Sequence, residues 1–341
     1  MQTRVLGSTG VKVSTLCLGA MMFGAWGDPE PDAGIRIIHR ALDAGVNFID
    51  TADVYSGGAS EEIVGKALAG GRRDSVVLAT KVHGAMGDGV NEQGNSRRWL
   101  ARECESSLRR LGTDYIDLYQ IHRPDPTTDI DETLGALTGL IQAGKIRYAG
   151  SSTFPASQIV AAQWVAQQRN RERFVCEQPP YSILVRGVEA EVLPVCQQYR
   201  MGVIPWSPLA GGWLTGRYRK GADVPRSRRA ERLPQRYDMS LPGNQAKLEA
   251  ADKLAALAGE AGMPLIHLAL AFVLNHPAIT AAIIGPRTME HLESQLGAAD
   301  VTLSPEILDR IDEIVPPGIN LNPADGGYQP PSVTDPALRR R

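Results

Sequence analysis

Short apolar runs alternate with longer segments of helical period along almost the whole chain. Eight runs have the length of buried strands, at residues 15–21, 47–52, 76–82, 115–121, 146–152, 174–180, 202–208 and 280–286. The segments between them repeat apolar residues three and four positions apart, and several begin at Ser, Asp or Pro and end near Gly. This alternation predicts parallel strands that are joined by right-handed helical crossovers.

Eight such units within 341 residues favour a closed (β/α)8 barrel, the TIM barrel, over a doubly wound sheet. The pattern alone leaves an open Rossmann or flavodoxin-like sheet as the alternative. Against a Rossmann fold, the glycine-rich run LGAMMFGAWG lacks the G-x-G-x-x-G spacing and has no helix directly behind it. We therefore expect an α/β barrel.

The expected organisation is one barrel domain, residues 1–315, and a C-terminal tail, residues 316–341. The segment TRVLGSTGVKVS predicts an N-terminal β-hairpin. Residues 211–243 are rich in Gly, Pro and Arg and predict a long loop, a kind of segment that is usually functional or disordered. Trp213 in this loop is a candidate to project over the site. The tail is irregular and either lies over the barrel mouth or is disordered.

Composition narrows the classes of function. The formal net charge of -2 excludes a basic footprint for nucleic acid or an anionic membrane surface. The four cysteines have no C-x-x-C spacing, and no His, Asp or Glu set has metal-ligand spacing, so we expect no metal. Neither a signal core nor a long apolar run occurs, which predicts a cytoplasmic protein without a membrane partner. The basic run at 225–232 is either a solvated loop or a phosphate-binding loop.

Polar residues lie at the ends of three consecutive apolar runs. Asp50, Lys81 and His122 end the second, third and fourth runs, and Tyr55 follows Asp50 by five positions. Singly, they are ordinary turn, surface or loop residues. A barrel would bring all four to one mouth, because the carboxyl ends of its strands meet there.

Such a set can handle a proton. The unperturbed pKa of a phenol is about 10, and a buried ammonium beside it favours the phenolate. That ammonium itself needs a paired carboxylate. We therefore expect Asp50 to hold Lys81, Lys81 to tune Tyr55, and Tyr55 to exchange a proton with a substrate oxygen to which His122 donates a hydrogen bond. These residues can give a proton to an oxygen but supply neither a nucleophile nor a metal. Carbonyl reduction needs such a set, if a cofactor supplies the hydride.

The segments FIDTADVY, LATKV and YIDLYQIHRPD resemble the signature segments of the aldo-keto reductases, and the resemblance covers nearly the whole chain. It is closer to the bacterial and potassium-channel β-subunit-like branch. The resemblance implies a TIM barrel that binds NADPH or NADP+ across its mouth and acts on aldehydes or ketones. It assigns catalysis to Asp50, Tyr55, Lys81 and His122. The expected substrate pocket comprises Met22, Trp26, Tyr55, His122 and Arg123.

The resemblance also implies the cofactor contacts. They are Gly19, Ala20, Met21, Asp50, Ser152, Thr153, Gln178, Trp206, Ser207, Pro208, Leu209, Gly211, Arg217, Arg228, Gly285, Arg287, Thr288, His291 and Gln295. Trp206 would stack on the nicotinamide, the loop after it would follow the pyrophosphate, and Arg287 would bind the adenosine 2′-phosphate. One departure concerns the carboxamide: Thr153 stands where the family commonly has Asn.

Two other functions stay open at this point. A relationship to potassium-channel β-subunits allows a cofactor-sensing binding subunit with little turnover. The same residues could also oxidise a sugar or a secondary alcohol, with Tyr55 as the base. The chain is expected to be a monomer or a homo-oligomer.

Overall fold

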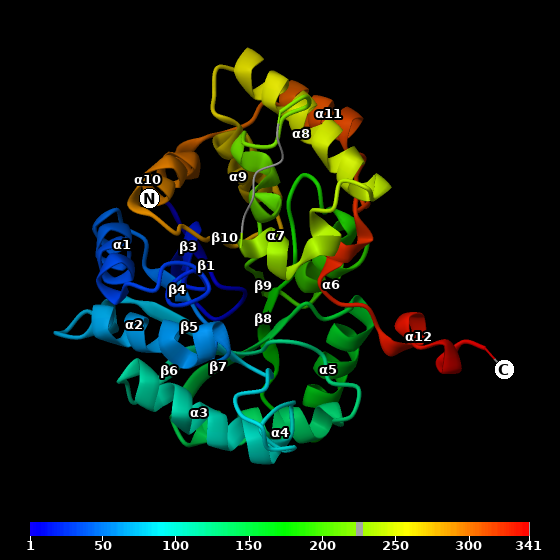
Figure 1. The fold of residues 1–341 in the computed structure, drawn as a ribbon. Coiled ribbons are helices and arrows are strands. Elements are labelled where there is room, and N and C mark those ends of the chain that lie inside the picture. The colour runs from blue at the N-terminus through cyan, green and yellow to red at the C-terminus, as the bar shows by residue number, and fades with distance from the viewer. Residues whose placement is uncertain (223–227, 341) are drawn as a thin grey trace.

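The computed structural model describes residues 1–222 and 228–340, without the side chains of residues 228 and 229. Eight parallel strands form one sheet in the order β10-β3-β4-β5-β6-β7-β8-β9. The strands are β3 (Leu16–Gly19), β4 (Phe48–Asp50), β5 (Val77–Val82), β6 (Ile116–Ile121), β7 (Ile146–Ser152), β8 (Phe174–Gln178), β9 (Gly202–Val203) and β10 (Ala282–Ile284). Figure 1 shows them surrounded by helices. Each strand lies within one of the eight predicted runs.

Hydrogen bonds between the first and last strands of this order close the sheet. The backbone N–H groups of Thr280 and Ala281 donate to the Val203 carbonyl, at 2.8 and 3.4 Å, and Ile283 donates to the Pro205 carbonyl at 3.0 Å. Strand β9 is short because Pro205 has no N–H to offer a neighbour. The closed (β/α)8 barrel is thereby confirmed, and the open-sheet alternative is wrong.

Helices cover the outside of the barrel (Figure 1). They are α1 (Pro31–Asp43), α2 (Ala59–Leu68), α3 (Arg97–Leu111), α4 (Ile130–Gln142), α5 (Ala156–Arg169), α6 (Val192–Gln198), α8 (Pro242–Glu260), α9 (Leu265–Asn275), α10 (Met289–Leu296) and α11 (Pro305–Ile314). Side chains cap several of them; for example, Ser96 accepts from the N–H of Trp99 at the start of α3. Their apolar faces pack on the outer face of the sheet to form the main core.

A smaller core fills the barrel interior and is closed by the N-terminal hairpin. Strands β1 (Thr3–Val5) and β2 (Lys12–Ser14) pair antiparallel, as predicted. Leu6 and Val13 of this hairpin join inward-facing strand residues such as Phe48 and Leu118 in the interior cluster. The hairpin therefore covers one end of the barrel, and the mouth at the carboxyl ends of the strands is the end that remains for a site.

The long loop contains short helical pieces and an aromatic anchor. It includes the 3-10 turns η4 (Ala210–Thr215) and η5 (Pro234–Arg236) and the short helix α7 (Arg228–Arg232). Trp213 stacks on Tyr218 with ring centroids 4.2 Å apart, and the ammonium of Lys247 lies 4.6 Å from the Trp213 ring. Trp213 is fully buried. The expectation that it projects over the site is wrong, because stacking and a cation–π contact hold it inside.

The tail returns along the mouth before it leaves the barrel. The Arg186 N–H donates to the Ile319 carbonyl at 2.8 Å, and the Asn322 side chain donates to Asn244 at 2.7 Å. The carboxylate of Asp325 pairs with Lys247 at 2.8 Å. Beyond these contacts, α12 (Pro331–Thr334) and the C-terminus project away from the barrel (Figure 1).

No single helix among residues 1–222 and 228–340 is long and apolar enough to cross a membrane; α8 and α9 meet the length and composition criteria only as a pair bent by 95°.

Candidate active site

Lys81 lies at the centre of a buried network at the barrel mouth. Its ammonium donates to Asp50 Oδ1 at 2.6 Å, to the Thr51 carbonyl at 2.8 Å and to the Tyr55 hydroxyl at 3.2 Å. The Lys81 side chain is fully buried and that of Asp50 is 3% exposed. Burial acts to lower the pKa of Lys81, but Asp50 and Tyr55 outweigh it and raise the pKa above its ordinary value. The lysine is therefore a permanent cation that links a carboxylate to a phenol.

The second oxygen of Asp50 is held by two amides. Gln120 Nε2 donates to Asp50 Oδ2 at 3.0 Å and Gln178 Nε2 donates to it at 2.9 Å. Both residues are buried and come from β6 and β8. Sequence reasoning assigned Gln178 to the cofactor and missed Gln120, although an amide inside the apolar run DLYQI was a visible signal. Together they fix the carboxylate that pairs with Lys81.

Tyr55 reaches this network through a tight turn after β4. It begins the 3-10 turn η1 (Tyr55–Gly58), in which Ser56 has φ 51° and the next two residues are glycines with positive φ. Its ring is tilted against Trp26 and meets the edge of His122, with centroids 5.8 Å away in both cases. Asp50, Tyr55, Lys81 and His122 thus converge, together with Trp26.

His122 is half-buried directly after β6. Burial, followed by the charges of Arg123 and Lys81, holds the pKa of His122 well below its ordinary value. The imidazole is therefore neutral near pH 7. A neutral imidazole can donate one hydrogen bond to an oxygen at the mouth without competing for the proton of Tyr55.

The ends of β7 and β8, together with Trp206, form one side of the mouth beside the network. Ser152 Oγ donates to the Gln178 carbonyl at 2.9 Å, and Trp206 Nε1 donates to Thr153 Oγ1 at 3.3 Å. Thr153 has φ 60°, a conformation that Asn tolerates better than a β-branched residue. Gly327 of the tail approaches so closely that a Cβ there would lie 2.7 Å from the Trp206 ring. The tail thus borders the ring that is predicted to stack on a cofactor.

Glu177, which sequence reasoning missed, supports this side of the mouth through hydrogen bonds to β7 and the residues after it. Its carboxylate accepts from the Ser151 hydroxyl and, at 3.1 Å, from the Phe154 N–H. Burial raises the pKa of Glu177 to about 7, although these hydrogen bonds and the charge of Arg123 oppose the shift. An acid in the apolar run FVCEQ was the available signal. Glu177 thereby connects the two strands that carry Ser152, Thr153 and Gln178.

The raised pKa of Glu177 predicts a pH-dependent stability. The folded state binds this proton more tightly than the unfolded state, so stability falls as pH rises from about 4.5 to about 7. Glu177→Gln should remove this part of the slope, worth up to about 3 kcal/mol of unfolding free energy. Urea denaturation of both proteins across this range measures the difference, with the exposed Glu172→Gln as control. A wild-type-minus-variant difference that is constant with pH would contradict the prediction.

The loop after Trp206 is built from left-handed residues. Ser207, Ala210, Gly211 and Gly212 have φ of 57°, 49°, 69° and 106°. Such conformations strain the two non-glycine residues and are retained mainly where function requires them. Pro208 is buried, whereas Leu209 and Gly211 are half-buried. The side chain of Arg228, predicted to clamp a pyrophosphate, lies outside the described residues.

A cationic cluster surrounds the start of α10. Thr288 caps the helix by accepting from the His291 N–H at 3.3 Å. Burial lowers the pKa of His291, and the charges of Arg287 and Arg217 lower it further. Arg217, predicted near the pyrophosphate, therefore lies close to this helix. A helix N-terminus with two arginines is suited to an anion.

Gln295 completes this end of the predicted cofactor site. It is buried, its Nε2 donates to the His291 carbonyl at 2.6 Å, and its Oε1 has no hydrogen-bond partner among the described residues. Gly285 has open space on its Cβ side. A buried acceptor without a partner, such as Gln295 Oε1, is suited to the amino group of an adenine.

The end of β3 and the residues after it supply backbone groups, more than side chains, to the mouth. Gly19 and Ala20 are buried, and the Ala20 N–H donates to the Asp50 carbonyl at 2.8 Å. Met21 and Met22 are half-buried. Gly19 and Ala20 therefore adjoin the Asp50 strand; their contact with a cofactor stays a prediction.

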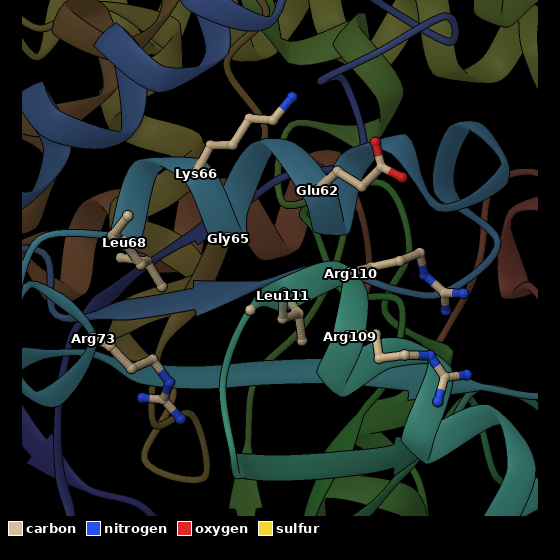
Figure 2. Close-up of a pocket in the computed structure, with 10 residues that line it drawn as sticks. Glu62, Gly65, Lys66, Leu68, Arg73, Arg109, Arg110 and Leu111 are labelled. Atoms are coloured by element: carbon tan, nitrogen blue, oxygen red, sulfur yellow. The ribbon is translucent and has the colours of Figure 1, made fainter.

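A separate groove lies on the outside of the barrel, between α2 and the end of α3 (Figure 2). It has a volume of about 540 Å³ and is lined by Glu62, Gly65, Lys66, Leu68, Ala69, Arg73, Arg109, Arg110, Leu111 and Gly112. None of the predicted site residues lines it. The groove is therefore distinct from the mouth.

The fold and the site define an α/β barrel whose mouth carries a phenol, an ammonium and a carboxylate in contact. A model of the aldo/keto reductase family matches residues 15–316. The chain belongs to the aldo/keto reductase family.

Curated relatives include a bacterial oxidoreductase, a potassium channel subunit beta and a fungal aldo-keto reductase. The chain is 40% identical to an uncharacterized oxidoreductase, YrpG, of Bacillus subtilis, over 93% of this chain and 96% of that protein. It is 37% identical to a probable voltage-gated potassium channel subunit beta of Arabidopsis thaliana, over 92% and 97%. It is also 34% identical to an aldo-keto reductase of Fusarium vanettenii, over 92% and 91%.

Proposed function

We propose that the protein is an NADPH-dependent reductase of aldehydes or ketones, acting reversibly, in the cytoplasm. The observation that carries the proposal is the bridge of Lys81 between Asp50 Oδ1, at 2.6 Å, and the Tyr55 hydroxyl, at 3.2 Å. A phenol beside a buried cation is equipped to give up and regain a proton. Four buried cysteines without a disulfide support a reducing compartment.

In this mechanism the chain's own residues handle the oxygen of the substrate. When bound, NADPH would be the source of the hydride for the carbonyl carbon. Tyr55 donates its hydroxyl proton to the carbonyl oxygen, so that an alcohol forms. Lys81 stabilises the negative charge left on the phenol oxygen, and Asp50 compensates the lysine. His122, neutral and in edge contact with Tyr55, orients the carbonyl by a hydrogen bond.

Several features support NADPH as the cofactor. The half-buried indole of Trp206 presents a ring at the mouth, and the left-handed loop after it offers backbone to a pyrophosphate. Arg287 and Arg217, close to His291, suit the additional 2′-phosphate that distinguishes NADPH from NADH. Gln295 Oε1 is a buried acceptor for the adenine.

The proposal is tested by NADPH absorbance with a panel of aromatic aldehydes. We expect aldehyde-dependent oxidation of NADPH with equimolar formation of the alcohol. NADPH should be preferred over NADH by about tenfold to a hundredfold in kcat/KM, the range for losing charge-assisted hydrogen bonds to one phosphate. Failure of every aldehyde to oxidise either cofactor would overturn the proposal.

A second candidate is a cofactor-sensing subunit, favoured by the relatives named as potassium channel β-subunits. Such a protein would bind NADPH tightly yet turn over slowly. Single-turnover and steady-state measurements on the preloaded protein separate the two. A fast first reduction followed by cofactor release slower than about 1 per minute would favour sensing, since typical enzymes turn over at about 1–10³ s⁻¹.

A further inference from the structure

Three arginines surround the mouth at the substrate side of Tyr55. Arg123 follows His122 at the end of β6, whereas Arg232 and Arg236 come from the long loop. The Arg232 guanidinium lies 3.9 Å from the ring of Trp26, and that of Arg236 lies 5.7 Å from the ring of Trp206. Positive charge therefore approaches the catalytic phenol from two separate segments.

Arg123 directly follows His122 in the sequence. It is half-buried, and its Nη1 donates to the backbone carbonyl of His122. No ion pair within residues 1–222 and 228–340 involves it. Burial lowers the pKa of Arg123 and so does the charge of Arg236, whereas Tyr55 and Glu177 act in the opposite direction. Arg123 thus lies within electrostatic reach of Tyr55 and of a second guanidinium.

The nearby carboxylates are held by other partners, and neither forms an ion pair with Arg123. Asp325 pairs with Lys247 at 2.8 Å and with Arg236 at 3.6 Å. Glu177 accepts from the Ser151 hydroxyl and a backbone N–H, and burial raises its pKa to about 7. A half-buried arginine that is desolvated without a carboxylate is unfavourable, unless an anion arrives to pair with it.

We propose that Arg123, aided by Arg236 and Arg232, binds an anionic group of the substrate, so that the preferred substrates are aldehydes or ketones that carry a carboxylate or a phosphate. This inference rests on the proposed reductase function. The guanidinium of Arg123 offers planar, paired donors that match either group. Anion binding at Arg123 would place the carbonyl group of the substrate toward Tyr55 and His122. His122 precedes Arg123 in the sequence, and Tyr55 lies within electrostatic reach of it.

The competing explanation is a structural role, because Arg123 also donates to the His122 carbonyl. A structural arginine would affect all aldehydes equally, whereas an anion-binding arginine discriminates between them. The informative quantity is therefore the ratio of kcat/KM for an anionic aldehyde to kcat/KM for a neutral one of the same shape.

The experiment compares 4-carboxybenzaldehyde and 4-formylphenyl phosphate with neutral 4-methylbenzaldehyde at saturating NADPH. The wild-type protein should prefer an anionic aldehyde, mainly through a lower KM, and added salt should weaken that preference. Arg123→Gln should lower the anionic-to-neutral ratio by about tenfold to a hundredfold, and Arg123→Lys should retain part of it. Arg147→Gln, an exposed arginine at the opposite end of the barrel, is the matched control with an unchanged ratio.

A binding measurement separates the two levels of the proposal. Calorimetric titration of the NADP+-loaded protein with 4-methylbenzoate should give binding that Arg123→Gln weakens. If no aldehyde is reduced but this binding is seen, the reductase proposal fails and the anion site stands. If all three aldehydes are reduced with a ratio that Arg123→Gln leaves unchanged, the anion site is overturned and the reductase stands. The aldehyde with the higher kcat/KM identifies carboxylate or phosphate as the preferred group.

Discussion

Tyr55→Phe is expected to lower kcat for aldehyde reduction by about 10²–10⁴-fold, the range for loss of a general acid. The hydroxyl lies 3.2 Å from the Lys81 ammonium, and phenylalanine keeps the ring contacts with Trp26 and His122 while it removes the proton. Affinity for the cofactor should change little, because the proposed partner of the replaced group is the substrate oxygen and not the cofactor. Steady-state kinetics and a separate NADPH-binding titration measure these two effects.

Tyr115→Phe is the matched control for this experiment. Tyr115 precedes β6 at the opposite end of the barrel, where its hydroxyl donates to Asp74 at 3.3 Å. Its replacement removes the same group without reaching the mouth, so kcat should stay close to the wild-type value. A Tyr55→Phe protein that retains most of its aldehyde reduction would show that another group donates the proton.

The barrel and the central network could be predicted because both depend on the local pattern of apolar residues and on one rule of topology. Eight apolar runs of strand length were visible, and parallel strands place their carboxyl ends together. Asp50, Lys81 and His122 therefore had to meet once the barrel closed. Tyr55 followed because only a short turn separates it from Asp50.

Other features depend on contacts between segments far apart in the chain. Gln120 holds Asp50 across 70 residues, and Glu177 braces a turn 23 residues earlier. The burial of Trp213 arises from Tyr218 and Lys247, which stack around it only after the long loop folds. A single sequence gives the chemistry of such residues but does not show which surfaces meet, so these roles emerge only from the packed structure.

The arginines at the mouth also differ in how far the sequence alone could place them. Arg123 was among the residues that the family resemblance placed in the substrate pocket. The approach of Arg232 and Arg236 requires the long loop to fold back over Trp26 and Trp206. Asp325 reaches Arg236 only because the tail crosses the mouth. The polar residues at the strand ends could thus be predicted from local pattern, whereas the arginines of the long loop reach the mouth only through loop packing.

Lys81→Met is expected to lower the free energy of unfolding by about 3–5 kcal/mol and to lower kcat strongly. Methionine fills a similar volume but leaves Asp50, 3% exposed, as a buried carboxylate held only by Gln120 and Gln178. The pKa of Lys81 is raised above its ordinary value of 10.5, so the wild-type ion pair is intact at neutral pH and is lost only as the pH rises through this raised pKa. Urea denaturation at pH 7 therefore measures the full effect.

The double variant Asp50→Asn/Lys81→Met separates stability from catalysis. Removing both charges eliminates the uncompensated carboxylate, so most of the lost unfolding free energy should return, because a buried ion pair replaced by neutral groups is often close to neutral in stability. Activity should not return, because the cation beside the Tyr55 oxygen is still absent. Recovery of both would show that Lys81 serves the fold alone, whereas recovery of stability without kcat assigns the ammonium to the proton transfer itself.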